Sequence, residues 1–589
     1  MQRSLSVILI GHRGVGKTSL GKAAAKHLGW EFVDVDQALS TAYQRSIDDY
    51  FLRGDVALFR EREIAQLTKS LTTRRPTIIA AGGGLAVSPR FLEVIAAHPP
   101  ICVVWLVRQV STAQLSNRPR LHPNLSLENE QLKLANERDP SYQQAAHDRF
   151  EIDSDLGEDR SGFELAYRIA SISAFIRSSF FKQMTHTCQT SGDLHRAMAL
   201  GLHIEYRTDQ AHDFSLTDLP AGSLVSLRTD SAIDLHGRTD LSLDIDTIFR
   251  HHQPPEGVTW FISTHDSTEI VPDVDKVAIP IDSCRQLIEI RERLPDQAML
   301  YPIGDRWRWY RLTMLSEMPA HLPAFVALPG AQSAAGQPTL LDYARCYLCK
   351  DPPLLRFGLI GQATDCSYGL DFHPQILLNG IYVGIPVPPE EFWDACQLLK
   401  TLSFRGLSVT NPHKASAGKM VGARTPLNTL AHYPYGWVGT DTDVQGAATI
   451  LDQLVDPVLV IGRGAMGRLL VSLLEKAARP PPHIAPSDSI DSATLQRVNT
   501  IVNASGRDLL PAVLNHLERH PDVLLTELRY NQSNCRHPRF IDGTSWFFAQ
   551  AAGQINYWGL GMSELIAFPC PRLTSRNAFL KVAIDRMRD

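Results

Sequence analysis

A glycine-rich segment near the N-terminus, GHRGVGKT at residues 11–18, has the residue types and spacing of a phosphate-binding loop. In such a loop, which joins a strand to a helix, backbone N–H groups cradle phosphates, and here Gly14 and Gly16 would provide them. Lys17 would reach the β- and γ-phosphates of a nucleotide, and the Thr18 hydroxyl would ligate Mg²⁺. A chance glycine-rich turn is the alternative. The lysine, the hydroxyl and the flanking pattern together favour a site for ATP and Mg²⁺.

The elements that must position this loop follow from alternating apolar runs and helical patterns. Over the first 180 or so residues the apolar runs are SVILIG, EFVDVD, TIIAAGGG and ICVVWLV, and the helical pattern LGKAAAKHLG follows the loop. That alternation predicts an α/β fold in which helices cover a parallel sheet. Asp34 and Asp36 end the second run, where alternate residues share one face of a strand.

Five motifs in a fixed order make residues 1–182 resemble the shikimate kinase family: DVDQ, LFREREI, AAGGGLA, NRPRL and ANERDPSY. The resemblance implies a kinase site that uses Lys17. It also implies that Asp34 joins Thr18 in holding Mg²⁺. Asp36 would meet the substrate hydroxyls and act as the base.

The same resemblance assigns the substrate carboxylate to two arginines. Arg60 and Arg138 would clamp the carboxylate of shikimate, a task suited to planar guanidinium groups that bind in a bidentate way. Arg118, on a lid, would contact the nucleotide phosphates. Three glycines would let the backbone approach the ligand: Gly82, Gly83 and Gly84.

Residues 183–345 contain further strand-like runs and resemble type I 3-dehydroquinase. In that family a lysine forms a Schiff base with the substrate ketone and a histidine shuttles protons. The motifs ISTHDS and DKVAIP place His265 and Lys276 at these two positions. Ser226 stands where the family has a glutamate. The resemblance implies four further ligand contacts: Arg228, Arg311, Ser333 and Gln337.

The length of this segment predicts a shortened β/α barrel. An eight-fold barrel typically needs ~250 residues, and about 160 are present here. His265 and Lys276 are only 11 residues apart on successive strand-like runs, whereas a βαβ crossover needs about a dozen residues or more. We therefore expect at least one helix to be missing. We interpret the two residues as remnants of a dehydratase site without catalytic geometry.

Residues 346–589 resemble shikimate dehydrogenase, a family with a substrate lobe and a Rossmann-type lobe, here expected at about 350–450 and 455–545. In that family a lysine and an aspartate handle the hydroxyl proton during hydride transfer. Lys414 and Asp443 occupy these positions, and a structural ion pair is the alternative reading. The implied substrate contacts are Ser367, Thr410, Asn428 and Gln550.

Several positions depart from the dehydrogenase pattern. Gly369 replaces a serine that would bind the substrate carboxylate, and Ser408 replaces an asparagine. The turn GRGAMGR resembles a dinucleotide fingerprint. The segment that follows, PPPHIAPSDSID, has no arginine for a 2′-phosphate and carries two acids, so NADP binding is doubtful and dinucleotide binding is left open. The glycines of this turn are Gly462, Gly464 and Gly467.

Composition limits the functions of the whole chain. Its 589 residues have a net charge of -5, and no helix-turn-helix, zinc cluster or basic region is evident. Direct DNA binding is therefore not expected. The nine cysteines include one close pair, Cys346 and Cys349, and are interpreted as reduced thiols. Neither a signal peptide nor a membrane span is evident, so we expect a cytoplasmic or nuclear protein.

The order of the three domains resembles the C-terminal part of the fungal pentafunctional AROM polypeptide and the fungal quinate repressor family. The latter resemblance implies a transcription repressor that senses quinate, shikimate or a dehydro-derivative and binds the activator protein of the pathway. The rival interpretation is a working shikimate kinase within a multifunctional enzyme that retains some dehydrogenase activity. A truncated AROM-like gene is a third.

Overall fold

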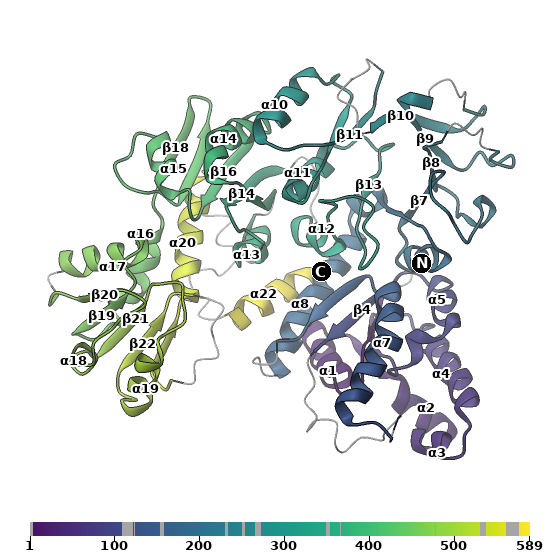
Figure 1. The fold of residues 1–589 in the computed structure, drawn as a ribbon, viewed down its shortest axis with the longest axis horizontal. Coiled ribbons are helices and arrows are strands. Elements are labelled where there is room, and N and C mark those ends of the chain that lie inside the picture. The colour runs from purple at the N-terminus through teal and green to yellow at the C-terminus, as the bar shows by residue number, and fades with distance from the viewer. Residues whose placement is uncertain are drawn as a thin grey trace. The chain divides into compact units, whose positions relative to one another are not determined.

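The computed structural model describes two compact units, each presented by itself. The first comprises Met1–Pro353 together with Ala583–Asp589, and the second comprises Leu354–Val582 (Figure 1). The described residues are 4–108, 122, 124–153, 158–229, 234–249, 254–265, 273–348, 354–365, 367–377, 379–477, 479–529, 537–560 and 576–588.

The N-terminal domain of the first unit contains a five-stranded parallel sheet with strand order β2-β3-β1-β4-β5. The predicted α/β fold is thus confirmed. Because the strands are parallel, their carboxyl ends meet at one edge of the sheet, where the chain leaves β1, β2 and β3. The strands are β1 (Ser6–Ile10), β2 (Glu31–Asp34), β3 (Thr77–Ala80), β4 (Ile101–Val107) and β5 (Asp148–Glu151).

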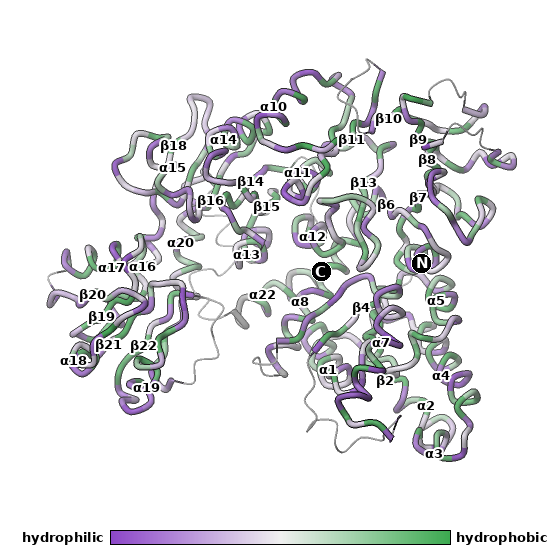
Figure 2. The backbone as a smooth tube through the Cα atoms, in the orientation of Figure 1, coloured by the Kyte–Doolittle hydropathy of each residue, from purple (hydrophilic) through white to green (hydrophobic). Residues whose placement is uncertain are grey.

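Helices with defined ends cover this sheet. Helix α1 begins after Gly16 and ends at Gly29, and both glycines adopt left-handed conformations that other residues rarely take. Helix α7 is capped by Ser126, whose side chain accepts a hydrogen bond from the Asn129 N–H. Hydrophobic and hydrophilic residues alternate along these helices (Figure 2). The helices are α1 (Lys17–Leu28), α2 (Val35–Tyr43), α3 (Ile47–Leu52), α4 (Val56–Ser70), α5 (Pro89–Ala96), α7 (Leu127–Ala145) and α8 (Glu158–Arg177).

The central part of the first unit is an eight-stranded sheet with the order β12-β11-β10-β9-β8-β7-β6-β13, and every pair of neighbours is parallel. The last strand returns beside the first, as in a β/α barrel. The strands are β6 (Met184–Thr187), β7 (His203–Arg207), β8 (Leu224–Leu227), β9 (Ser242–Asp246), β10 (Thr259–His265), β11 (Lys276–Pro280), β12 (Met299–Ile303) and β13 (Ala324–Phe325).

The barrel is shortened by the loss of outer helices, as the sequence predicted. Between β7 and β8 the described chain forms only a 3₁₀ turn, Leu216–Asp218, and between β9 and β10 only another, Thr247–Phe249. All eight strands are nevertheless present. The helices that the structure does describe are α9 (Ser191–Leu200), α10 (Cys284–Arg293), α11 (Arg308–Met314) and α12 (Leu340–Cys346).

The second unit contains two five-stranded sheets, of order β15-β14-β16-β17-β18 and β20-β19-β21-β22-β23. The first is mixed and the second is entirely parallel, the arrangement of a Rossmann-type lobe. The strands of the mixed sheet are β14 (Leu355–Gly361), β15 (Gly380–Pro386), β16 (Phe404–Val409), β17 (Thr429–Tyr433) and β18 (Gly436–Thr440). Those of the parallel sheet are β19 (Val458–Ile461), β20 (His483–Ala485), β21 (Thr500–Asn503), β22 (Leu524–Glu527) and β23 (Phe540–Asp542).

Nine helices of the described chain accompany these sheets or follow them: α13 (Gly369–Ile376), α14 (Phe392–Thr401), α15 (Lys414–Met420), α16 (Asp443–Leu451), α17 (Ala465–Lys476), α18 (Ser492–Leu495), α19 (Pro511–Arg519), α20 (Thr544–Tyr557) and α22 (Arg576–Arg588). In the first unit, the Met587 carbonyl near the end of α22 accepts a hydrogen bond from Arg177 at 2.8 Å. No helix in the described ranges has the length and apolar character needed to cross a membrane.

The turn between β19 and α17 yields a stability prediction. A Cβ atom at Gly467 would lie 1.9 Å from the Gly462 carbonyl oxygen, whereas nothing lies within 4 Å of a Cβ at Gly464. Gly467→Ala should therefore lower the free energy of unfolding of the second unit by about 1–3 kcal/mol, the usual cost of overpacking. Gly464→Ala is the matched control, expected to change it by less than about 0.5 kcal/mol. Urea unfolding with hydrogen exchange of β19 peptides measures both, and equal effects would contradict the prediction.

Candidate functional site

The phosphate-binding loop joins β1 to α1 in a conformation that requires glycine. Gly14 and Gly16 have φ angles of 83° and 103°, in the region that side-chain-bearing residues rarely adopt. The Lys17 ammonium group donates hydrogen bonds to the carbonyl oxygens of Gly11 and His12 at 2.8 and 2.9 Å. The lysine thus lies folded over its own loop, where a phosphate group could replace the two carbonyls as its partner.

Thr18 and Asp34 meet at the carboxyl ends of β1 and β2. The Thr18 hydroxyl donates to one carboxylate oxygen of Asp34 at 2.7 Å, and the other oxygen accepts from the Gln37 N–H at 3.1 Å as the cap of α2. A hydroxyl beside a carboxylate is the hard oxygen donor set that Mg²⁺ takes in nucleotide sites. The residues present therefore fit the predicted metal ion.

Two carboxyl groups, one buried and one half-buried, converge on the turn after β3. A Cβ atom at Gly82 would lie 2.0 Å from Oε1 of Glu63 and 2.8 Å from Oδ1 of Asp36, so only glycine fits there. Neither of these two oxygens has a hydrogen-bond partner in the part of the chain that the structure describes. Sequence reasoning found Asp36 and missed Glu63. Glu63 could have been found from its spacing: it lies three residues after Arg60 in LFREREI, which places the two side chains on one face of α4.

The two predicted carboxylate-binding arginines flank the same turn. Arg60 pairs with Glu63, and a Cβ at Gly84 would lie 2.2 Å from its Nη2 atom. Arg138, on α7, donates to the Gly83 carbonyl at 2.9 Å. The structure therefore brings Asp36, both arginines and the three glycines together. Arg118 lies outside the described residues.

Helix α7 also holds the phosphate-binding loop. Asp139 pairs with His12 at 2.6 Å, and the buried Glu130 pairs with Arg13 at 2.6 Å. One helix thus contacts both the predicted nucleotide loop and, through Arg138, the glycine turn. Neither acid was singled out from the sequence, because pairs more than a hundred residues apart leave no local pattern.

The central barrel has a cavity of about 530 Å³ at the carboxyl ends of its strands. Five residues predicted from the sequence line it, and Gln337 accepts hydrogen bonds from one of them, Ser333, close by. Sequence reasoning missed the three acids that line this cavity: Glu205 on β7, Asp209 just after β7, and Asp246 at the end of β9. The predicted lining residues are Arg228, His265, Lys276, Arg311 and Ser333.

The barrel charges are paired across strands. Asp244, fully buried, accepts from Lys276 at 2.7 Å and from Arg228 at 2.6 Å, and Asp246 pairs with His265 at 2.9 Å. Burial alone would raise the pKa of Asp244, but Arg228 and Lys276 lower it overall. Burial lowers the pKa of Lys276, and Asp244 offsets this only in part. The cavity therefore combines cations and acids of the kind that bind carboxylate and hydroxyl groups.

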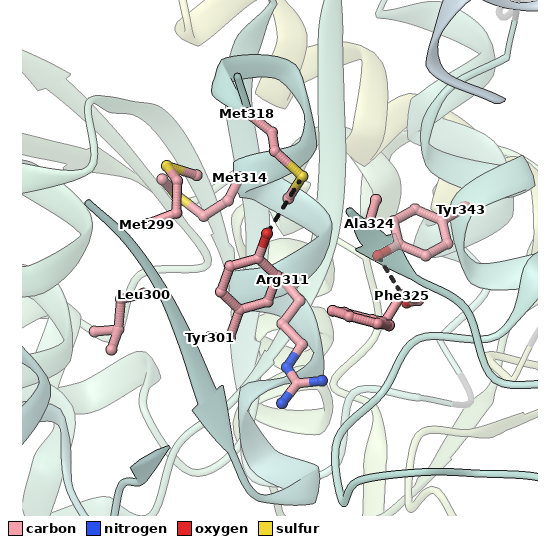
Figure 3. Close-up of a pocket in the computed structure, with 9 residues that line it drawn as sticks. All are labelled: Met299, Leu300, Tyr301, Arg311, Met314, Met318, Ala324, Phe325 and Tyr343. Atoms are coloured by element: carbon pink, nitrogen blue, oxygen red, sulfur yellow. Dashed lines mark hydrogen bonds between the residues drawn. The ribbon is translucent and has the colours of Figure 1, made fainter. Parts of the chain in front are cut away.

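Glu205, on the strand next to that of Ser226, is a buried carboxylate with two hydroxyl partners. The Ser226 hydroxyl donates to Glu205 at 2.5 Å, and the Thr187 hydroxyl donates to the other oxygen at 2.6 Å. Arg311 reaches the cavity from α11, past Tyr301. Figure 3 shows its guanidinium pointing away from a cluster of methionines that includes Met318.

The second unit has a cavity of about 500 Å³ between its two sheets. Lys414 and Asp443 form an ion pair at 2.6 Å on its wall. The Asn428 amide oxygen accepts from the Thr442 N–H at 2.8 Å and is thus also a structural anchor. Sequence reasoning missed Gln554, which accepts from the Ser408 hydroxyl at 2.9 Å. All six predicted substrate residues line this cavity: Ser367, Thr410, Lys414, Asn428, Asp443 and Gln550.

The predicted dinucleotide turn follows β19. Gly462 has a φ of 110°, and Gly464 reaches the cavity wall. Of the two acids after β20, Asp491 caps the short helix α18 by accepting from the Thr494 N–H at 2.8 Å. The glycine turn after β19 therefore has the predicted form. The segment after β20 uses one of its two acids, Asp491, as a helix cap.

A family model described as shikimate kinase matches residues 13–162. The shikimate kinase of Xanthomonas euvesicatoria pv. vesicatoria (strain 85-10) is 34% identical over 176 residues, which are 29% of this chain and 95% of that protein. The chain belongs to the shikimate kinase family. The membership concerns the N-terminal domain, which is called the kinase-family domain below.

Two other comparisons extend this picture. The shikimate kinase of Syntrophus aciditrophicus (strain SB) is 35% identical over 114 residues, 19% of this chain, and the chain spans only 58% of that relative. The crystal structure of shikimate dehydrogenase from Thermotoga maritima is similar over 40% of this chain and over 100% of the Thermotoga chain, with 18% sequence identity and a TM-score of 0.31.

The electrostatics of the kinase-family domain centre on its two carboxyl groups at the glycine turn. Burial raises the pKa of Asp36, and the nearby Asp34 raises it further, against Lys17 and Arg60. Burial raises the pKa of Glu63 from 4.5 to about 7, which outweighs the attraction of Arg60. Carboxyl groups with raised pKa values are suited to proton transfer near neutral pH.

The Glu63 carboxyl makes stability depend on pH. Because its pKa is higher in the folded chain, its stabilising contribution is complete below about pH 4.5 and is lost as the pH rises through 7. The free energy of unfolding should fall by about 3 kcal/mol over this range, and Glu63→Gln should remove that dependence. The exposed Glu61 provides the control variant Glu61→Gln. Denaturant titrations between pH 4 and 8 test this, and an unchanged slope in Glu63→Gln would refute it.

Proposed function

We propose that the kinase-family domain binds ATP and shikimate together, and that the whole chain is a transcription repressor of quinate utilisation that senses a pathway metabolite. One observation carries the first part: Asp36, Arg60 and Arg138 converge on a glycine turn whose missing side chains leave room for them, in the domain that also carries the phosphate-binding loop. A carboxyl group and two guanidinium groups around one turn match a ligand that carries both a carboxylate and hydroxyls.

The nucleotide half of the site follows from the loop. Lys17 would exchange its two carbonyl partners for the β- and γ-phosphates of ATP. Thr18 and Asp34 would hold Mg²⁺, which when bound neutralises charge on the phosphoryl group. The loop N–H groups would bind the remaining phosphate oxygens.

In the substrate half, Arg60 and Arg138 would bind the shikimate carboxylate and so direct a ring hydroxyl towards Asp36. In a transfer step, the hydroxyl oxygen bonds to the γ-phosphorus, the bond from that phosphorus to the ADP oxygen breaks, and Asp36 accepts the hydroxyl proton. A carboxyl whose pKa is raised by burial is a better base than one in water.

The regulatory part of the proposal rests on the chain as a whole. The order of its domains resembles the quinate repressor family, and each predicted set of ligand-side residues lies around a cavity or turn. A sensor needs different affinities in two states, and turnover is unnecessary. Repression would act through the pathway activator protein, in the cytoplasm or nucleus, without DNA contact, in keeping with a net charge of -5.

The second candidate is a working shikimate kinase, within an enzyme that retains some dehydrogenase activity. It is favoured by the assembled Lys17, Thr18, Asp34 and Asp36, and by the Lys414–Asp443 pair. The two candidates are compatible, because a regulator can retain kinase chemistry.

A coupled assay with ATP, Mg²⁺ and shikimate separates them. Turnover in the usual range of ~1–10³ s⁻¹, abolished in Lys17→Ala and reduced about 10²–10⁴-fold in Asp36→Asn, would support the enzyme. Shikimate binding without turnover, weakened in Arg138→Lys, would support a sensor. Absence of both ATP and shikimate binding would refute the proposal for this domain.

Repression itself calls for a binding experiment with the purified chain and the activator protein of the quinate pathway. We expect a complex whose affinity changes when quinate or shikimate is added, and no tight, sequence-specific shift of DNA. A sequence-specific gel shift by the chain alone, or no complex under any ligand condition, would contradict this mechanism.

A further inference from the structure

Helix α7 contacts both the phosphate-binding loop and the glycine turn of the kinase-family site. Three of its side chains hold the site: Glu130 and Asp139 bind the phosphate-binding loop, and Arg138 binds the Gly83 carbonyl. A small displacement of the helix would therefore change the nucleotide loop and the predicted carboxylate site together.

The C-terminal end of α7 is held by Arg196 of the barrel helix α9. Its side chain is 1% exposed, and Nη1 donates to the carbonyls of Gln143 and Ala146 at 3.0 and 3.3 Å. Nη2 pairs with Asp193 at 2.8 Å. A guanidinium that binds the last carbonyls of a helix also complements its dipole. Arg196 is thus a charged contact between the C-terminal end of α7 and the barrel helix α9.

The same guanidinium holds a loop of the barrel cavity. Nη1 of Arg196 also donates to the Pro329 carbonyl at 2.8 Å. Pro329 begins a loop that ends at Ser333, which lines the 530 Å³ barrel cavity. Ser333 also lines a second cavity of about 500 Å³, whose other walls include Gln143 and Gln144 of α7. Arg196 therefore contacts both the helix that holds one site and the loop that borders the other.

The Ser333 end of this loop borders the barrel cavity and contacts Gln337. The Ser333 hydroxyl donates to Gln337 at 3.1 Å, while Nε2 of Gln337 is buried without a partner among the described residues. A ligand hydroxyl or carboxylate in the cavity would compete with Gln337 for the Ser333 hydroxyl. The cations and acids of the cavity suit a hydroxylated ring carboxylate.

We propose that Arg196 is a positioning residue that couples the barrel cavity to the kinase-family site. A hydroxylated ring carboxylate bound in the barrel displaces the loop from Pro329 to Ser333, and Arg196 transmits the shift to α7. This inference rests on the proposed binding of ATP by the kinase-family domain. By linkage the coupling is reciprocal, so nucleotide binding changes the affinity of the barrel for its ligand by the same factor.

The test is a titration of the full chain with a fluorescent ATP analogue, with and without saturating quinate as the barrel probe. We expect quinate to change the nucleotide dissociation constant at least about fivefold, the lower range of allosteric coupling. Arg228→Ala removes a cation of the barrel cavity and should abolish the effect, which assigns it to this cavity. In Arg196→Lys the change should fall below about twofold, because one ammonium group cannot hold the helix, the loop and Asp193 together.

The matched control is Arg238→Lys. Arg238 also binds an aspartate and two backbone carbonyls in the barrel, those of Leu216 and Leu219, and its variant should couple as the wild type does. Gly192→Ala is a second probe that keeps Arg196, since its Cβ would lie 2.1 Å from Nε2 of Gln144 and displace it from the interface. It should weaken the coupling even if Arg196→Lys does not fold.

The outcomes are distinct. Nucleotide binding that is unaffected by quinate in the wild type, or equally affected in Arg196→Lys and Gly192→Ala, would overturn the coupling. So would a quinate effect that survives in Arg228→Ala. A chain that binds no nucleotide even without quinate would instead refute the proposed function.

Discussion

Charge balance at the turn Gly82–Gly84 is the constraint on which the kinase-family domain depends. Two carboxyl groups, the fully buried Glu63 and the half-buried Asp36, lie against this turn, and an uncompensated buried charge is costly. Arg60 and Arg138 supply the compensation from two different helices. The glycines let all four groups approach the backbone of the turn.

The barrel must also compensate buried charges, and it does so with fewer helices around its strands. Its inner strands keep alternating charged residues, and its outer layer has lost helices that contribute little to the cavity. Asp244 is fully buried, so Arg228 and Lys276 must stay beside it, and each would be an unpaired buried charge without it. Pairing across strands thus preserves the charged mouth of the barrel while the scaffold around it shortens.

Much of this was predictable from the sequence, for a physical reason. The phosphate-binding loop, the parallel sheets and the shortened barrel each depend on local spacing, such as glycines around a lysine or apolar runs of strand length. The partners of the site residues depend on the packing of distant segments. Glu130 pairs with Arg13 across more than a hundred residues, and Glu205 serves Ser226 from another strand. No pattern within one window of sequence encodes such pairs.

Part of the missed set did leave a signal. Alternation along β9, SLDID, puts Asp244 and Asp246 on one face, and buried acids on a strand imply cations opposite them. The need to neutralise these acids would therefore have predicted cationic partners such as Arg228 and Lys276. The sequence prediction gave Arg228 as a ligand contact and Lys276 as a remnant of a dehydratase site, whereas in the structure both are counter-charges of Asp244.

Arginine, rather than lysine, suits the contact between the barrel and α7. Arg196 must bind an aspartate, the end of a helix and a loop at once, and only the guanidinium has donors fixed in several directions. Because the group is buried, any movement of one partner breaks a hydrogen bond that water cannot replace, so the partners shift as a set. A buried arginine with three kinds of partner therefore makes the seating of α7 depend on the barrel loop. Surface ion pairs between domains could not do this, because water would compensate each loss.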